Sequence, residues 1–356
     1  MKKLLLILLL LPSTVFAYQT NATSTVLMDT DNNRIIYKDN CNEVRSLASI
    51  SKIMTAILAI ESKQIKDTVK IGQEIEGSYG SGIYIKENEE IKMIDLVYGL
   101  LLRSGNDAAL AIAFNVAGSL EEFVNLMNNK AQQLKMNNTK FSNPSGLDGT
   151  NMIGNYGTAC DMAKLMSYCM KNETFRRITN TRTYKAKTNL NFYDWTNKNK
   201  LLRTYKYATG GKTGFTDIAK RTLVTTASKR GVNLVAVTLN DGNDFEDHKN
   251  MFEEAFKEYK NFDILKKGNV EIIGEKFYKN RSFYLNEDFS YLLRDDEVKD
   301  LLIKFKLKEL YVYNNNDKVG EATVYLGKDK IHKANIFVKI KKEKINPIEL
   351  IKRLFK

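Results

Sequence analysis

The chain has 356 residues, of which 43% are hydrophobic, and its formal net charge at pH 7 is +13. This apolar content suffices for a packed core, which excludes global disorder, and the length predicts one large domain followed by a smaller one. Because no helix-turn-helix pattern or aromatic and basic RNA-binding motif accompanies the positive charge, we expect no nucleic acid partner.

The N-terminal residues 1–17 have the pattern of a secretory signal peptide. They begin with two lysines, continue with a short apolar run, and end in small residues, with Val15 and Ala17 at the −3 and −1 positions of the cleavage site. An uncleaved N-terminal anchor is the alternative, although the apolar run is short for a span. We therefore expect an exported protein of the cell envelope that begins near Tyr18. The loss of Lys2 and Lys3 lowers its formal charge to +11.

The chain then predicts mixed helices and strands. Residues 24–29 and 34–39 flank the turn-forming run TDNN and predict a β-hairpin, and the next helix is expected to begin at Ser46 as its N-cap. The remaining predicted elements of the large domain are helices at 93–102, 107–117, 161–170 and 244–260, an ordered loop at 139–151, and a hairpin of strands 222–228 and 232–240.

The sequence changes character near Phe262, where short alternating segments separated by Asn, Asp, Gly and Lys predict a small all-β module. We therefore expect four parts. These are a signal peptide at 1–17, a large domain at 18–261, a β-rich domain at 262–345, and a short basic amphipathic tail at 346–356.

Ser49 and Lys52 are the first candidate site residues. They lie three positions apart on a predicted helix, so Oγ and the amine share one face. A lysine surrounded by apolar residues such as Ile53 and Met54 should have a lowered pKa and can act as a base for a serine nucleophile. Helix N-terminal amides near Ser49 also favour developing negative charge.

The Ser-x-x-Lys pattern alone is a weak signal, because a chain of this length contains it about twice by chance. Two further patterns strengthen it. Ser104 and Asn106 lie on a turn between two apolar helices, where polar groups can face a cleft. Residues 212–214 (Lys-Thr-Gly) lie in a glycine-flanked segment just before the predicted strand pair, where a backbone edge is open to a substrate.

These three patterns, in this order, resemble the active-site motifs of the penicillin-recognising serine enzymes. The longer stretches ASISKIMTA, LLLRSGNDAA, NPSGLD and TGGKTGFTD are similar to those of the low-molecular-mass D-alanyl-D-alanine carboxypeptidases, over about residues 20–260. The resemblance implies an α+β fold of the penicillin-binding and β-lactamase type. Its five-stranded antiparallel sheet is flanked by helices, and a small C-terminal all-β domain follows.

The resemblance also implies a role for each motif residue. Ser49 would be the acylated nucleophile, Lys52 its general base, and Ser104 a proton relay to the leaving D-alanine. Asn106, Lys212, Thr213 and Gly214 would bind the substrate, with Lys212 and Thr213 on its terminal carboxylate. The backbone amides of Ser49 and Phe215 would form the oxyanion hole. Neither a metal nor a cofactor is implied. The chain departs from the usual pattern at Lys220, where glycine is common.

The implied activity is removal of the terminal D-alanine from peptidoglycan stem pentapeptides through an acyl-enzyme, with β-lactam antibiotics as covalent inhibitors. A class A β-lactamase is one alternative, but the NPSGLDG loop lacks the Glu-x-x-x-Asn pattern that serves deacylation in that class. A catalytically silent wall-binding protein is the other. Loss of Ser49, Lys52 or Lys212 would favour it, and all three are present.

The C-terminal residues predict contact with a membrane surface. Residues 328–356 hold ten Lys and Arg against three Asp and Glu, and apolar residues recur at helical spacing from Ile348 to Phe355. A short basic amphipathic helix can lie in the headgroup region of anionic lipid, or it can dock on the β module instead.

The cysteines and histidines carry no predicted chemistry. Cys160 and Cys169 fall on opposite faces of one predicted helix, and we expect all three cysteines, with Cys41, to be packing residues. His248 and His332 lie in polar sequence and are expected at the surface.

Overall fold

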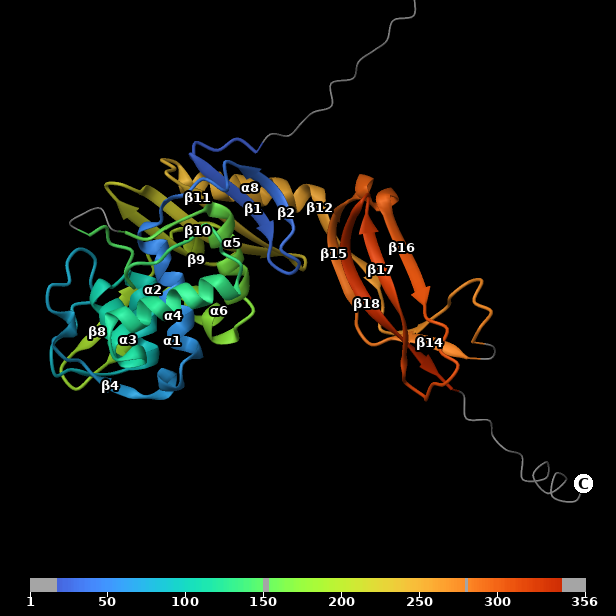
Figure 1. Ribbon diagram of the computed structural model, residues 1–356. Helices are drawn as coiled ribbons and strands as arrows, with labels where there is room; N and C mark the ends of the chain where they lie inside the picture. The colour runs from blue at the N-terminus through green and yellow to red at the C-terminus, as the bar shows by residue number, and fades with distance from the viewer. Residues whose placement is uncertain (1–17, 150–153, 279–280, 341–356) are drawn as a thin grey trace, which may run out of the picture. The chain divides into compact units, whose positions relative to one another are not determined.

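The computed structural model describes residues 18–149, 154–278 and 281–340. The chain divides into two compact units, one ending at Lys257 and the other beginning at Glu258 (Figure 1). Each unit has its own hydrophobic core. The predicted signal peptide at 1–17 and the predicted tail at 346–356 lie outside the described residues.

The first unit, called the catalytic unit below, is built around a five-stranded antiparallel sheet. Its strands lie in the order β2 (Ile35–Asp39), β1 (Ser24–Asp29), β11 (Val232–Leu239), β10 (Lys220–Lys229) and β9 (Ala208–Thr216). The two predicted hairpins are therefore confirmed. The middles of β10 and β11 are buried on both faces because both faces are covered, and β9 is an edge strand.

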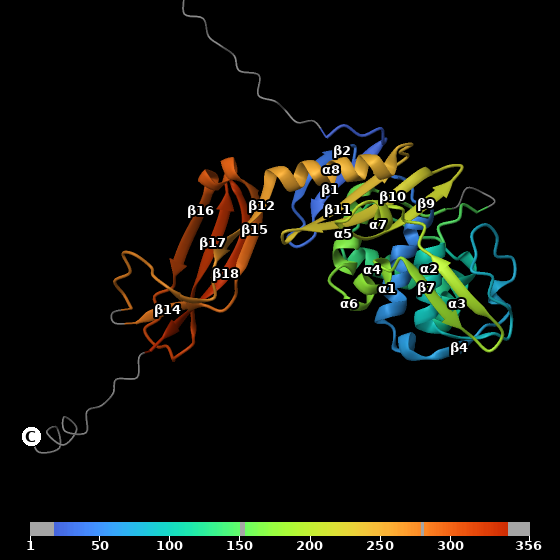
Figure 2. The same ribbon diagram turned by 180° about the vertical axis from the view of Figure 1, so that it is seen from behind.

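Helices cover both faces of this sheet (Figures 1 and 2). α5 (Ala159–Cys169) packs on β1 and β11, and its core continues through α1 (Lys52–Glu61), α2 (Met93–Arg103), α3 (Asn106–Ala117), α4 (Leu120–Gln133) and α6 (Glu173–Thr179). α8 (Asp244–Glu258) covers the other face. The predicted helices at 93–102, 107–117, 161–170 and 244–260 are confirmed within a few residues.

The expected helix start at Ser46 is wrong. Ser46 belongs to the short strand β3 (Arg45–Ser46), which pairs with β6 (Tyr156–Gly157). A 3-10 turn, η1 (Ala48–Ser51), then precedes α1. The tertiary strand pair overrides the local N-cap preference of Ser46, so the 3-10 turn begins at Ala48 and the α-helix only at Lys52.

The other elements of the catalytic unit are short. They are η2 (Lys63–Lys66), β4 (Thr68–Lys70), η3 (Gln73–Ile75), β5 (Glu90–Lys92), β7 (Thr183–Lys187), β8 (Phe192–Thr196) and α7 (Leu201–Thr204). Within the described ranges no single helix is long and apolar enough to cross a membrane. α3 and α4 pass that test only as a pair bent by 87°.

Two sequence expectations about side chains are corrected by the structure. Cys41 and Cys160 form a disulfide across 119 residues of sequence, while Cys169 is free and buried. The start of α5 lies beside Cys41, whose carbonyl accepts a hydrogen bond from the Cys160 amide at 3.0 Å. His248 is fully buried, not at the surface, because α8 presses it against the sheet. The disulfide joins segments far apart in the sequence, and the burial of His248 depends on how α8 packs on the sheet. Local patterns reveal neither.

The second unit, called the β unit below, contains two antiparallel sheets. One pairs β12 (Tyr259–Leu265) with β15 (Phe289–Arg294). The other has the order β13 (Gly268–Val270), β14 (Ser282–Leu285), β18 (Asp329–Lys339), β17 (Lys318–Leu326) and β16 (Leu301–Leu307). A 3-10 turn, η4 (Asp295–Asp300), connects β15 to β16. Alternating side chains of the strands, such as Val319, Val324 and Ile336, fill the core of the β unit.

Candidate active site

Lys52 and Ser49 meet where η1 passes into α1. The Lys52 side chain is fully buried, and its Nζ donates to Ser49 Oγ at 3.0 Å. The same ammonium nitrogen donates to Asn106 Oδ1 at 2.7 Å and to the Ser145 carbonyl at 2.5 Å. Three acceptors therefore fix the lysine beside a serine that is itself only half-buried.

The pKa of Lys52 is lowered to about 7, mainly by burial and to a smaller extent by the positive charge of Lys198, while Asp107 acts in the opposite direction. An amine with this pKa is substantially neutral near pH 7, so it can accept a proton from a neighbouring hydroxyl. The expected lowering of this pKa is confirmed, with burial as its main cause.

Ser104 and Asn106 lie on the tight turn between α2 and α3. Ser104 adopts a left-handed conformation with φ of 64°, which is uncommon for a residue with a side chain. Asn106 opens α3, and its Nδ2 donates to the Tyr79 carbonyl at 2.6 Å while its Oδ1 accepts from Lys52. The buried Asp107 carboxylate accepts backbone amides of residues 83–85, which holds the neighbouring loop against this turn.

Lys212 links this turn to the sheet. It lies on the edge strand β9, is buried, and its Nζ donates to Ser104 Oγ at 3.0 Å and to the Thr213 carbonyl at 2.6 Å. Burial lowers the pKa of Lys212, and the charges of Lys52 and Lys198 lower it further. The two serines thus each accept a hydrogen bond from their own buried lysine.

Gly214 lets the edge strand approach the start of η1. A Cβ added to this glycine would lie 2.9 Å from the Ser49 amide nitrogen and 3.1 Å from that of Ile50. No side chain fits there, because the backbone that leads to Phe215 passes beside the Ser49 amide. This close passage places the two amides that the resemblance implies for the oxyanion hole in the same part of the molecule.

The NPSGLD segment supports Lys52 from the far side. Thr55 of α1 donates to the Pro144 carbonyl at 2.6 Å, and the next carbonyl, of Ser145, accepts from Lys52. Gly146 adopts φ of +79°, and an added Cβ would collide with the Ala48 carbonyl. The glycine of this motif is therefore required by a close backbone contact behind Ser49.

A cleft of about 370 Å³ opens at Ser49 and Ser104. The predicted residues Thr213, Gly214 and Phe215 line it, and Phe215 is exposed. Sequence reasoning missed the other lining residues, which are Ser81, Lys198, Lys200, Arg221, Asp244 and Phe245. Their positive charges suit an anionic ligand. The only sequence signal for these lining residues is the pair of basic runs NKNK and AKR, and such runs are common on protein surfaces.

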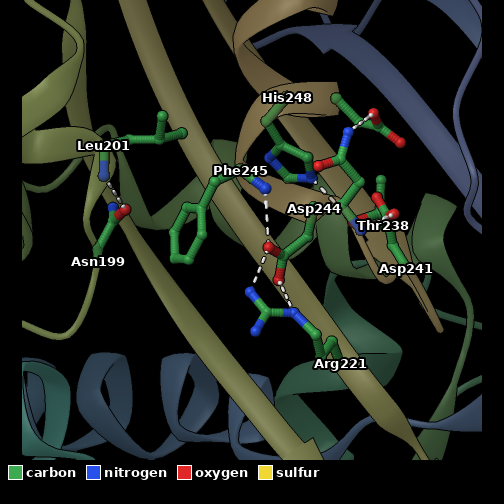
Figure 3. Close-up of polar contacts among 10 residues, drawn as sticks. Asn199, Leu201, Arg221, Thr238, Asp241, Asp244, Phe245 and His248 are labelled. Atoms are coloured by element: carbon green, nitrogen blue, oxygen red, sulfur yellow. Dashed lines mark hydrogen bonds and ion pairs between the residues drawn. The ribbon is translucent and has the colours of Figure 1, made fainter.

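Arg221 is fixed at the edge of this cleft by Asp244, the first residue of α8 (Figure 3). Its Nη2 and Nε donate to the two carboxylate oxygens at 2.5 and 3.2 Å, and Asp244 Oδ1 also accepts the Phe245 amide at 2.7 Å. The guanidinium lies over the Phe245 ring. Next to it, Lys220 adopts φ of 56°, which is the conformation that favours the glycine common at this position.

The structure therefore brings together every residue that the sequence predicted for the site. A profile of the D-alanyl-D-alanine carboxypeptidase family matches residues 12–243. The chain belongs to this family. It is accordingly a serine peptidase of the penicillin-binding type.

Individual relatives agree with the family match. The chain is 31% identical to the D-alanyl-D-alanine carboxypeptidase DacF of Bacillus subtilis over 81% of its own length and 77% of that protein. It is 28% identical to DacA of Escherichia coli, covering 84% of this chain and 76% of DacA.

The predicted fold class is confirmed by solved structures of the family. Penicillin-binding protein 5 of Haemophilus influenzae superposes with a TM-score of 0.75 at 25% identity, covering 90% of this chain and 97% of that one.

Proposed function

We propose that this carboxypeptidase removes the terminal D-alanine of peptidoglycan stem pentapeptides through an acyl-enzyme on Ser49. The observation that carries the proposal is the contact of Lys52 Nζ with Ser49 Oγ at 3.0 Å, on a cleft that is also lined by Ser104, the hydrogen-bond partner of Lys212. Histidine is not needed as the base, because burial lowers the pKa of Lys52 into the range in which an amine accepts protons.

In the acylation step, Ser49 Oγ attacks the carbonyl carbon of the penultimate residue while its proton passes to neutral Lys52. The carbonyl oxygen gains negative charge and accepts hydrogen bonds from the Ser49 and Phe215 amides. The tetrahedral intermediate then breaks its peptide bond. The proton that Lys52 accepted passes through Ser104, which Lys212 contacts, to the leaving amine, so Lys52 becomes neutral again. D-Alanine departs, and an ester to Ser49 remains.

In deacylation, a water molecule attacks the ester carbonyl and gives its proton to Lys52. The ester bond breaks, and Ser49 recovers its proton as the shortened peptide leaves.

The same geometry accepts a β-lactam ring in place of the peptide. Its amide bond breaks in the same way, but the leaving nitrogen stays attached, so the acyl-enzyme persists as a covalent inhibitor complex.

Substrate binding is assigned to the residues around the nucleophile. We infer that Asn106 holds the peptide backbone, Gly214 lets β9 run beside it, and Lys212 with Thr213 receives the terminal carboxylate. Arg221 adds a further fixed positive charge on the cleft. These positive groups favour a substrate with a free carboxylate over an amidated one.

We also propose that the protein is exported, with residues 1–17 as its signal peptide, and that it acts outside the cytoplasm. Residues 346–356 are proposed to contact the anionic surface of the membrane. The support for both is the sequence pattern of each segment.

Ser49→Ala tests the central proposal. We expect it to abolish both covalent labelling by fluorescent penicillin and D-alanine release from a pentapeptide, because the variant lacks the hydroxyl that forms the ester. Alanine suits a helical turn, so thermal unfolding should change little. Labelling of the variant at the normal rate would refute Ser49 as the nucleophile.

Rapid turnover of a chromogenic β-lactam by the parent protein would favour the β-lactamase alternative.

A further inference from the structure

Three side chains of the β unit protrude into solvent to an unusual degree. Ile273, Val312 and Tyr311 are 93%, 90% and 86% exposed, and no other large hydrophobic residue in the described part of the chain is exposed as much. A single exposed apolar side chain is ordinary, whereas several at one place indicate a contact surface.

The three residues lie at one end of the five-stranded sheet of the β unit. Ile273 is in the loop between β13 and β14, and the other two are in the loop between β16 and β17. The register pairs Ser282 with Lys339 and Lys318 with Phe337, so the starts of β14 and β17 both lie beside the end of β18 (Figure 1). We call Ile273, Tyr311 and Val312 the apolar tip.

The loops that carry the apolar tip are held together by their inner side chains. Tyr278 is buried, its hydroxyl donates to the Lys308 carbonyl, and the same oxygen accepts the Leu310 amide at 3.1 Å. The rings of Phe277 and Tyr311 meet edge to face with centroids 5.2 Å apart. The fold therefore fixes a platform with apolar residues on its outer side as well as in its core.

The end of the described chain indicates what this platform contacts. The Ile340 amide donates to Asn315 Oδ1 at 2.9 Å, so the described chain ends at the loop that carries Tyr311 and Val312, and residues 341–356 follow in the sequence. Those residues contain six Lys and Arg against two Glu. Protruding Ile, Val and Tyr side chains at the point where a basic sequence begins fit an anionic bilayer. There the aliphatic side chains enter the acyl boundary and tyrosine stays at the headgroups.

We propose that the apolar tip inserts into the headgroup region of an anionic lipid bilayer and is a membrane contact in its own right. The proposal goes beyond peptide hydrolysis, because it assigns a role to the β unit. It is also separate from any lipid contact made by residues 346–356.

Vesicle binding of a charge-substituted variant tests the proposal. The chain from Tyr18 to Lys356 is sedimented at low salt with vesicles of phosphatidylglycerol and phosphatidylcholine. Ile273→Asp with Val312→Asp should lower its partition coefficient at least about tenfold, since burial of one aliphatic side chain contributes about that factor. Phe192→Asp is the matched control, because Phe192 is similarly exposed but lies in the catalytic unit; this variant should bind like the parent. D-Alanine release checks that the catalytic unit is intact, and thermal unfolding of each variant checks the β unit.

A second set of chains ends at Ile340 and separates the tip from the tail. The tip substitutions should lower the residual binding of this shorter chain as well. If truncation lowers binding while the tip variant binds like the parent, the tail alone contacts lipid and the proposal is wrong.

Val312→Trp reports the position of the tip directly. Trp195, the only tryptophan, is buried in the catalytic unit, so it contributes a constant background. We expect phospholipids with brominated acyl chains to quench the new tryptophan. Emission that is blue-shifted without vesicles and is not quenched by brominated lipid would show that the chain itself covers the tip, which would overturn the proposal.

Discussion

Two regions of the catalytic unit bury titratable side chains against opposite faces of the same sheet. Lys212 pairs across the strands with Val224 and shares its face, whereas the next residue, Thr225, faces His248. Burial lowers the pKa of each group, and the pKa of His248 falls to about 3. The lysines bond to serines that line a cleft. Both ring nitrogens of His248 instead bond to threonine hydroxyls of the sheet.

The difference shows that a shifted pKa does not by itself mark a catalytic group. His248 is neutral because it is enclosed, and its hydrogen bonds to Thr225 and Thr238 lock α8 to the sheet (Figure 3 shows the Thr238 side). Lys52 is equally enclosed, but its partner Ser49 reaches solvent. Access of the bonded serine to the cleft is therefore the feature that distinguishes Lys52, the proposed base, from His248.

Among variants that keep Ser49, the largest expected effect comes from Lys52→Arg. Arginine keeps the positive charge but does not lose its proton at any working pH, so acylation should slow by about 10²–10⁴-fold. The rate of labelling by fluorescent penicillin measures the loss, and circular dichroism checks the fold. Near-normal labelling would remove Lys52 from the role of base and erase the contrast with His248.

The pH dependence of acylation sharpens the same comparison. Because the pKa of Lys52 lies at about 7, the fraction of neutral lysine falls about tenfold for each pH unit below that value. The acylation rate should therefore rise with pH through about 7 and then level off. A rate that stays constant from pH 5 to pH 8 would contradict a lysine base, and an inflection near 3 would point to His248 instead.

Arg221 should have a smaller effect, on binding. Arg221→Gln removes a fixed charge from the cleft, and the loss of a charge-assisted hydrogen bond to the substrate carboxylate lowers kcat/KM about 10-fold to 100-fold. Asp244→Asn keeps the guanidinium but weakens its anchor, so a milder loss is expected. Steady-state kinetics with free and amidated peptides measures both. An equal fall in kcat/KM for the free and the amidated peptide would show that Arg221 does not bind the substrate carboxylate.

The smallest effect on activity is expected at His248. His248→Leu leaves two buried threonine hydroxyls without their ring partners, which should cost about 2–3 kcal/mol of stability in urea unfolding while D-alanine release stays normal. Native His248 stays neutral far below its ordinary pKa of 6.5. Between pH 6.5 and about 3 the unfolded chain therefore binds more protons at this histidine than the folded protein does. The stability of the folded protein falls as the pH drops through this range. The leucine variant should lack this part of the decline. A folded variant without activity would show that the two regions are coupled.

The sequence by itself determined what short-range patterns encode. Helical periodicity located α2, α3, α5 and α8, and turn residues located the two hairpins. Motif spacing pointed to Ser49 with Lys52, to Ser104 with Asn106 and to residues 212–214, because the partners within each motif are neighbours on the chain. The family resemblance added Phe215, and tertiary contacts bring the three motifs together. Burial of Lys52 followed from its apolar neighbours.

Only the tertiary structure decided which distant surfaces meet. It paired Cys41 with Cys160, buried His248, and brought the Ser145 carbonyl to Lys52 and Arg221 to the cleft. Each of these contacts joins residues from different helices, strands or loops, and its partner is chosen by the packing of those whole elements. A stretch of ten residues contains only one of the two partners in such a contact, so its sequence pattern cannot identify the other partner.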